Sequence, residues 1–451
     1  MKVSASPLAA LAISVLLCGQ SAARETVLVI GDSLSREYQF EFPEFSEARN
    51  WVELLAVHRP DDFYFGPLKE TDLGLIASAC QLFGIDHPIC DALNEDDELE
   101  RYRYNWAIPT YSAQSYAGDL AGSSIVQGLI QDLINDDFDN VTSVVVFLGG
   151  NDIDSVYSSV YNGSPGAAAN IIARIESDLE DIIDFVLDDT PNMRMVLVNV
   201  PHVGATPEVK ADHPTDPIKT GRVTTALQTL DANLRALAMS KGIGYADILN
   251  LTLDLLPDDP YCLGGIPLIN ESTEEGDAEY IWLGGDLSQS FHPNTNGQAI
   301  VANAIVEGFN EKYNLDAQPL SEAEIVEILG LETPLTTWAN SFGLPANQRQ
   351  PEDDPDMDGL NNMIEFALDL DPTRHDTLPS PTMDGENLLF EYTRAAAACD
   401  VVEIIPEIST DLATWVPVPP EQITSPGENR TLVTLPKTQD RQQLRLKVRF
   451  L

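Results

Sequence analysis

Three short polar segments carry residue types that together can hydrolyse an ester. The tetrapeptide GDSL contains Ser33, whose hydroxyl is a candidate nucleophile. The tetrapeptide GGND contains Asn151, whose side-chain amide can donate a hydrogen bond to a developing oxyanion. The tetrapeptide FHPN contains His292, a candidate base. A serine nucleophile needs such a base nearby, because its own hydroxyl is weakly nucleophilic at neutral pH.

Each of these residues also has an ordinary structural explanation. Serine and asparagine are common helix N-caps, and taken singly that role explains most such positions. His202 is a second candidate for the base, because it follows an apolar run that ends at Val200. The other histidines lie on an apolar helix face or in loops: His58, His87, His213 and His375.

Apolar runs precede the candidate residues and predict the elements that position them. Thr26–Ile30, Ser143–Leu148 and Met193–Val200 are continuous apolar runs, typical of strands buried on both faces. Gly244–Ile248 is a weaker example. We expect Ser33 near the start of the next helix, where backbone N–H groups and the helix dipole favour an oxyanion.

Helical spacing of apolar residues alternates with these runs. It predicts helices over Ala167–Leu187, Thr224–Ser240 and Gln298–Tyr313. Strands alternating with helices predict an α/β fold with a parallel sheet covered on both faces. In such sheets ligands bind beyond the carboxyl ends of the strands, where the candidate residues fall.

Taken together and in this order, the three tetrapeptides resemble the conserved blocks of GDSL/SGNH hydrolases. The resemblance covers roughly Glu25 to Leu315. It implies a flavodoxin-like three-layer hydrolase domain and ester hydrolysis without a catalytic cofactor. It also implies that Ser33 is the nucleophile and donates its N–H to the oxyanion, that Asn151 is a side-chain donor, and that His292 is the base.

Two positions depart from the family pattern. The family usually has an aspartate three residues before the histidine, where this chain has Gln289. Asp286 lies six residues before His292, so either Asp286 or a backbone carbonyl is expected to orient the imidazole. The family's oxyanion glycine corresponds to Thr110, whose backbone N–H would replace it.

An acidic segment matches the spacing of a calcium-binding loop. Acidic residues fall at loop positions 1, 3, 5 and 12, glycine falls at position 6, and positions 7 and 9 can add oxygen ligands. The predicted ligands are Asp354, Asp356, Asp358, Leu360 through its carbonyl, Asn362 and Glu365. The segment also resembles thrombospondin type 3-like calcium segments, which implies a structural Ca²⁺ that stiffens the joint between domains. The alternative is a solvated acidic linker.

Changes in composition and in hydrophobic pattern divide the chain into four parts. Residues 1–23 have a short basic start, an apolar stretch and small residues, as in a signal peptide. Residues 24–316 form the predicted hydrolase domain and residues 317–376 a linker with the calcium-binding helical segment. Residues 377–451 contain short alternating runs between turns, which predict a small β-sandwich. Trp415 in this module is expected to be a core residue rather than a sugar contact.

Composition and charge restrict the partners. The formal net charge is −47, with 72 acidic against 25 basic residues, so nucleic acid is excluded as a partner. No stretch after the signal peptide predicts a transmembrane anchor. Of the four cysteines that remain, Cys80 and Cys90 are the expected disulfide pair, although four buried thiols are also consistent.

The sequence therefore predicts an exported serine esterase, extracellular or periplasmic, that acts on carboxylic esters, with acylated polysaccharide as a candidate substrate. Two other functions stay open. A lipase or phospholipase has the same chemistry. A catalytically inactive carbohydrate-binding or adhesion protein is suggested by Gln289, Thr110 and the added β-module. Oligomeric state is not predicted.

Overall fold

The computed structural model describes residues 24–41, 47–68, 74–83, 85, 87, 89–90, 101–257, 261–273, 276–284, 289–395, 398, 401–427, 429–436 and 443–450. The predicted signal peptide, Asp286 and Cys399 lie outside these residues.

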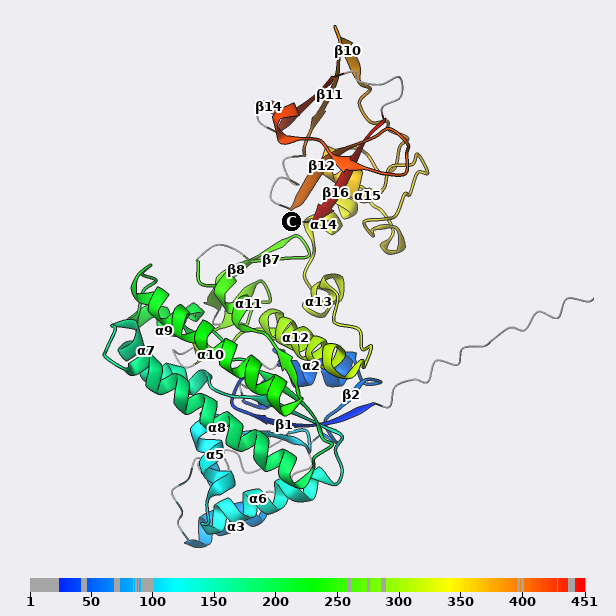
Figure 1. Ribbon diagram of the computed structural model, residues 1–451. Helices are drawn as coiled ribbons and strands as arrows, with labels where there is room; N and C mark the ends of the chain where they lie inside the picture. Colours follow the sequence, from blue (N-terminus) through cyan, green and yellow to red (C-terminus); the bar gives the residue numbers. More distant parts are fainter. Residues whose placement is uncertain are drawn as a thin grey trace, which may run out of the picture.

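The described part of the hydrolase region is built on a six-stranded parallel sheet (Figure 1). Its strand order is β2-β1-β4-β5-β6, and β3 also pairs with β1. The bounds are β1 (Glu25–Gly31), β2 (Phe63–Tyr64), β3 (Asn105–Ala107), β4 (Ser143–Phe147), β5 (Arg194–Val198) and β6 (Gly244–Ala246). The predicted parallel α/β class is confirmed.

Successive residues of each strand point to opposite faces of the sheet, so the apolar runs supply two cores. Leu28 and Ile30 of β1 pack on one face, in a cluster with residues from α5, α6, α8 and α10. Val27 and Val29 pack on the other face, with residues from α2 and α12. Helices therefore cover both faces, and the sheet is the middle of three layers.

The helices of the hydrolase region carry the following bounds. They are α1 (Tyr38–Glu41), α2 (Trp51–His58), α3 (Gly74–Phe83), α5 (Ala113–Ala121), α6 (Ile125–Phe138), α7 (Gly150–Tyr161), α8 (Ala167–Asp189), α9 (Pro207–Asp212), α10 (Lys219–Lys241), α11 (Leu249–Asp254), α12 (Thr295–Tyr313) and α13 (Glu322–Ile328). Among the described helices, none is long and apolar enough to cross a membrane. Cys80 of α3 and Cys90 form a disulfide, as predicted.

A small three-stranded arm follows α11 and was not predicted from the sequence. It consists of β7 (Tyr261–Leu263), β8 (Ile266–Thr273) and β9 (Tyr280–Leu283), with β7 and β8 antiparallel and β8 and β9 parallel. The hairpin between β7 and β8 reaches toward the C-terminal module (Figure 1). A Cβ at Gly265, in this hairpin turn, would lie 2.8 Å from Val401 Cγ1 and 2.9 Å from Phe450 Cδ1 of that module.

The C-terminal module contains two antiparallel sheets around one core. One sheet has the order β10-β11-β15-β14 and the other β13-β12-β16. The bounds are β10 (Thr382–Asp384), β11 (Asn387–Thr393), β12 (Val402–Ser409), β13 (Val416–Pro417), β14 (Ile423–Gly427), β15 (Arg430–Pro436) and β16 (Gln443–Phe450). Phe390 of β11 and Val402 of β12 belong to the same buried cluster, so the two sheets face each other.

The segment between the hydrolase sheet and these strands belongs to two different cores. Ile325 of α13 packs in the hydrolase cluster that contains α12. Leu335 of α14 (Pro334–Ser341) and Phe366 of α15 (Asn362–Leu368) pack instead in the core of the β-module. The acidic segment is therefore part of the C-terminal module.

Candidate active site

Ser33 lies in a tight turn directly after β1. The turn covers residues 33–35, and the next helix, α1, begins only at Tyr38 and is four residues long. The expectation that Ser33 lies near the start of a helix is therefore wrong, because a separate turn holds it. Instead, Asp32 holds the turn, because its Oδ1 accepts from the Leu34 N–H at 3.0 Å and its carbonyl accepts from the Ser35 N–H at 3.0 Å. Burial raises the pKa of Asp32 to about 7.

The turn brings Ser33 to His292, which is 259 residues away in the sequence. Ser33 Oγ lies 2.8 Å from His292 Nε2, within hydrogen-bond distance. His292 is buried, whereas Ser33 is half-buried and so retains contact with solvent. A histidine nitrogen at this distance can remove the serine proton during attack.

The arm of β7, β8 and β9 fixes the backbone of His292. The carbonyl of His292 accepts from the Leu283 N–H at 3.0 Å, and Asn294 donates its N–H to the Ile281 carbonyl at 2.7 Å. The Asn294 amide also donates to the Tyr280 carbonyl at 3.2 Å. His292 is thus held on both sides by strand β9, which gives the arm its role in the site.

Gln298, in the first turns of α12, joins the histidine side to the serine side. Its Nε2 donates to the Leu34 carbonyl at 3.2 Å and to the Tyr38 hydroxyl at 2.6 Å. Its Oε1 accepts from the Trp51 N–H at 3.2 Å. Gln298 was not predicted from the sequence, although a glutamine at a fully buried helix position is unusual.

Asn151 is linked to the segment that contains Thr110. Asn151 Nδ2 donates to the carbonyl of Tyr111 at 2.8 Å, which leaves its second N–H available. Thr110 has φ 67°, which lies in the left-handed region that favours glycine. Among the described residues, the backbone N–H groups of Ser33 and Thr110 have no acceptor.

Asp152 fastens the Thr110 segment to α7. Its Oδ2 accepts from the Ala113 N–H at 2.7 Å, and the guanidinium of Arg174 lies 3.8 Å from its Oδ1. Burial raises the pKa of this carboxyl above its ordinary value. The GGND tetrapeptide therefore contributes two side chains, Asn151 and Asp152, that bind the segment after Thr110.

His202, the other candidate base, contacts a different side chain. It is fully buried, and its Nε2 is 3.0 Å from Thr224 Oγ1. Burial lowers the pKa of His202 to about 4. The described contacts join Ser33 to His292 and none joins it to His202. Gln289 begins the short 3₁₀ turn that ends at Phe291, and the role of Asp286 stays a prediction.

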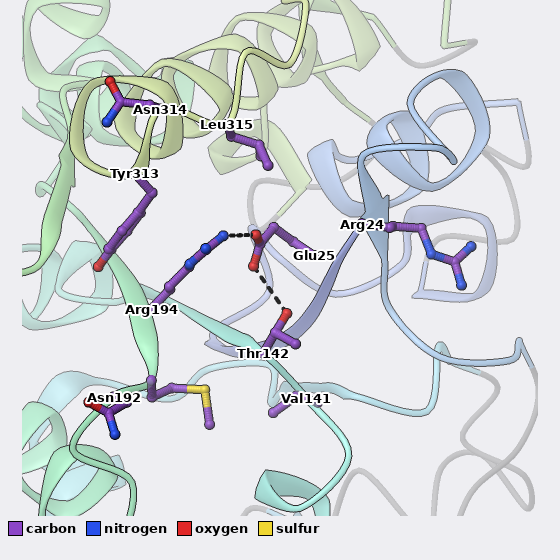
Figure 2. Close-up of a pocket in the computed structure, with 10 residues that line it drawn as sticks. Arg24, Glu25, Val141, Thr142, Asn192, Arg194, Tyr313, Asn314 and Leu315 are labelled. Atoms are coloured by element: carbon purple, nitrogen blue, oxygen red, sulfur yellow. Dashed lines mark hydrogen bonds and ion pairs between the residues drawn. The ribbon is translucent and has the colours of Figure 1, made fainter. Parts of the chain in front are cut away.

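A pocket of about 530 Å³ lies at the opposite, amino-terminal edge of the sheet (Figure 2). Glu25 at the start of β1 forms an ion pair with Arg194 there and accepts a hydrogen bond from Thr142 at 3.0 Å. None of the candidate catalytic residues lines it. Ligands of parallel sheets bind at the carboxyl edge of the sheet. We therefore place the active site at Ser33 and not in this pocket at the opposite edge.

The acidic segment forms a cluster of oxygen ligands. Carboxylate oxygens of Asp354, Asp356 and Asp358 lie within 4.8 Å of one another. Glu365, from α15, is fully buried, and neither of its carboxylate oxygens has a hydrogen-bond partner within the described chain. Burial and the surrounding aspartates, including Asp376, raise the pKa of Glu365 to about 8. A hard divalent cation would satisfy these orphaned oxygens.

The two further predicted ligands of the loop, Asn362 and Leu360, already make hydrogen bonds within the chain. Asn362 donates through Nδ2 to the carbonyls of Gln348 and Gln350, both at 2.9 Å, while its Oδ1 is buried without a partner. Leu360 donates its N–H to Asp358 Oδ1 at 2.7 Å. Gly359, at loop position 6, has φ 93° and donates its N–H to Asp354 Oδ2 at 2.9 Å.

A three-layer parallel α/β domain with a Ser–His pair at the carboxyl edge of its sheet is the arrangement of a serine hydrolase. The chain belongs to the GDSL-like lipase/acylhydrolase family, whose sequence profile matches residues 27–305. An ester-hydrolysing serine hydrolase is therefore the class of this protein. No curated protein gives a significant sequence match.

Solved structures resemble this region at low identity. An extracellular lipase from Streptomyces rimosus is 13% identical, with 63% of this chain and 99% of that chain covered and a TM-score of 0.36. A phospholipase A1 from Streptomyces albidoflavus is 14% identical, with 64% and 100% covered and a TM-score of 0.33.

We expect Asn151→Ala to lower kcat by about 10²- to 10³-fold, because one preorganised oxyanion donor is worth that much in a serine protease. Steady-state kinetics on p-nitrophenyl acetate measure the effect. Asn162→Ala is a matched control, since Asn162 lies at the exposed C-cap of the same helix. An unchanged kcat in folded Asn151→Ala would reassign Asn151 to supporting the Tyr111 carbonyl.

Proposed function

We propose that the protein is an exported esterase in which Ser33 Oγ attacks the carbonyl carbon of a carboxylic ester. The observation that carries the proposal is the 2.8 Å contact between Ser33 Oγ and His292 Nε2. His292 accepts the serine proton as the C–O bond forms, and then donates it to the departing alkoxide, leaving an acyl-serine. Water then loses a proton to His292, attacks the acyl-serine and releases the carboxylic acid, and the proton returns to Ser33.

The oxyanion of each tetrahedral intermediate needs preorganised donors. The N–H groups of Ser33 and Thr110 and the free N–H of Asn151 are the three groups we assign to it. The proposal is supported by the lack of acceptors for the two backbone groups within the described residues and by the left-handed backbone of Thr110. Donors held in place by the fold need no reorganisation when charge develops. Asp286 is our candidate for the group that orients His292.

Electrostatics favour a neutral substrate such as acylated polysaccharide over phospholipid. With a formal net charge of −47, the protein repels anionic headgroups and membrane surfaces. An acetylated glycan carries no such charge. A lipase or phospholipase remains the second candidate, because the family description includes lipases.

Product analysis separates these functions. We expect acetate release from acetylated xylan, no fatty acid release from anionic phosphatidylglycerol vesicles, and covalent labelling of Ser33 by a fluorophosphonate probe, located by peptide mass spectrometry. Fatty acid release without acetate release would support the lipase. Neither turnover nor labelling by the folded protein would support the inactive binding protein.

We also propose a structural Ca²⁺ held by the carboxylates of Asp354, Asp356, Asp358 and Glu365. The Leu360 carbonyl and the Asn362 side-chain oxygen complete the set of ligands. The orphaned carboxylate of Glu365 supports the proposal. The positive charge of the ion would offset the negative charges of these four carboxylates. It would also hold the acidic loop against α15, whose Phe366 lies in the module core. No catalytic step passes through this ion.

We expect Ca²⁺ at about 100 times its Kd to stabilise the C-terminal module by about 2.7 kcal/mol, since an ion that binds only the folded state stabilises it. Calorimetry with Ca²⁺ and with chelator measures this shift. Glu365→Gln should lose the shift, whereas Glu352→Gln, at an exposed acid nearby, should keep it. Coincident scans of the wild type would leave the segment as an acidic linker. Esterase activity should survive chelation.

A further inference from the structure

An apolar cavity is lined by the residues next in sequence to Ser33 and His292, although those two residues themselves do not line it. Leu34, which follows Ser33, and Phe291 and Pro293, which flank His292, all line it. Phe147 at the end of β4 and Leu251 of α11 add to the wall. The cavity therefore lies at the carboxyl edge of the sheet, where the substrate of such a fold binds.

The described residues that line this cavity include no charged side chain. His202 is its one titratable group there, and burial holds the pKa of that imidazole at about 4, so it is neutral at the pH of esterase assays. The polar side chains are already engaged, as shown by Thr252, which donates to the Ile248 and Leu249 carbonyls. The cavity thus offers an apolar surface that favours hydrocarbon.

The size of the cavity limits what it can hold. Its volume is about 50 Å³. By the same measure one water needs about 10–15 Å³, so the cavity holds roughly three to five non-hydrogen atoms. Trp282 and Leu255, at 3% and 4% exposure, form buried parts of its wall. A fatty acyl tail does not fit into such a space.

Provided that Ser33 is the nucleophile of an esterase, we propose that this cavity is the acyl pocket and that it selects acyl groups of two to about six carbons. The carbonyl carbon lies at Ser33 Oγ during attack, and the alkyl tail then enters the space between Leu34 and Phe291. Each methylene that is buried there raises kcat/KM by roughly fourfold. Methylenes beyond the end of the pocket add nothing or prevent productive binding.

The test is a series of p-nitrophenyl esters from acetate through butyrate, hexanoate and decanoate to palmitate. We expect kcat/KM of the wild type to rise toward butyrate or hexanoate and to fall at least tenfold by decanoate. Leu251→Trp, at a half-buried position of the wall, should remove the rise, so that kcat/KM for butyrate and hexanoate no longer exceeds that for acetate. Leu251→Ala should shift the optimum to longer esters. Leu253→Trp is the control, because Leu253 lies on the same helix but does not line the cavity.

The outcomes separate this inference from the proposed function. A wild type that hydrolyses no ester of the series contradicts the esterase itself. A wild type that hydrolyses decanoate and palmitate as well as butyrate overturns the acyl pocket while leaving the esterase intact. The pocket is also excluded if folded Leu251→Trp and Leu251→Ala both keep the wild-type chain-length profile.

Discussion

Ser33→Ala is expected to lower kcat on the order of 10⁶-fold, the loss found when the nucleophile of subtilisin is removed. The substitution deletes the one atom that forms the bond to the substrate carbonyl. Ser33 Oγ contacts His292 Nε2 at 2.8 Å, so its loss removes a single hydrogen bond. That bond is worth about 0.5–1.5 kcal/mol of stability, and the fold should persist.

Single-turnover and steady-state kinetics on p-nitrophenyl acetate, with circular dichroism to verify folding, measure this result. Ser155→Ala provides the control, because the Ser155 hydroxyl donates to the Asp152 carbonyl in its own helix. Full activity in folded Ser33→Ala would exclude the acyl-serine mechanism.

His292→Ala is expected to lower kcat by a similar factor of about 10⁶, since a serine nucleophile and its base act as one unit. His202→Ala should behave differently. It removes a buried ring and should cost about 2–5 kcal/mol of stability by leaving a cavity. Its kcat on acetate should stay within about tenfold of the wild type, because His202 bonds to Thr224 rather than to Ser33.

The pH profile gives a second discriminator between the two histidines. Burial lowers the pKa of His202 to about 4, so this imidazole is already neutral across the range of the assay. A fall of kcat/KM at acid pH with a midpoint well above 4 therefore cannot come from His202. An inactive His202→Ala together with an active His292→Ala would show that the base has been wrongly assigned.

The parallel sheet was predictable from the sequence because its strands are buried on both faces. Thr26–Ile30 and Ser143–Leu148 are continuous apolar runs, and they form β1 and β4 nearly as expected. The contact of Ser33 with His292 followed from the order of three tetrapeptides rather than from local pattern. Local pattern also failed at Ser33 itself, where a turn held by Asp32 replaces the expected helix start.

The arm that holds His292 was not predictable by the same reasoning. β9 is only four residues long, and its pairing with β8 depends on tertiary contacts such as the bond from Trp282 Nε1 to Asn270 Oδ1 at 2.9 Å. Gln298 was not predictable, because helical periodicity identifies the apolar face of a helix and does not identify a buried amide. The helices on either side of the acidic segment were also hard to place. The sequence does not show that their apolar residues Leu335 and Phe366 join the core of the C-terminal module.

The left-handed backbone of Thr110 makes the two proposed oxyanion donors Thr110 and Asn151 depend on each other. A β-branched residue at φ 67° is strained and persists only where its neighbours hold it. Asn151 is such a neighbour, because it binds the carbonyl of Tyr111, the next residue. Without Asn151, Thr110 can relax and turn its own N–H away. A double-mutant cycle should therefore show cooperativity: Asn151→Ala should cost less catalysis in a Thr110→Gly background, where glycine adopts the conformation without strain.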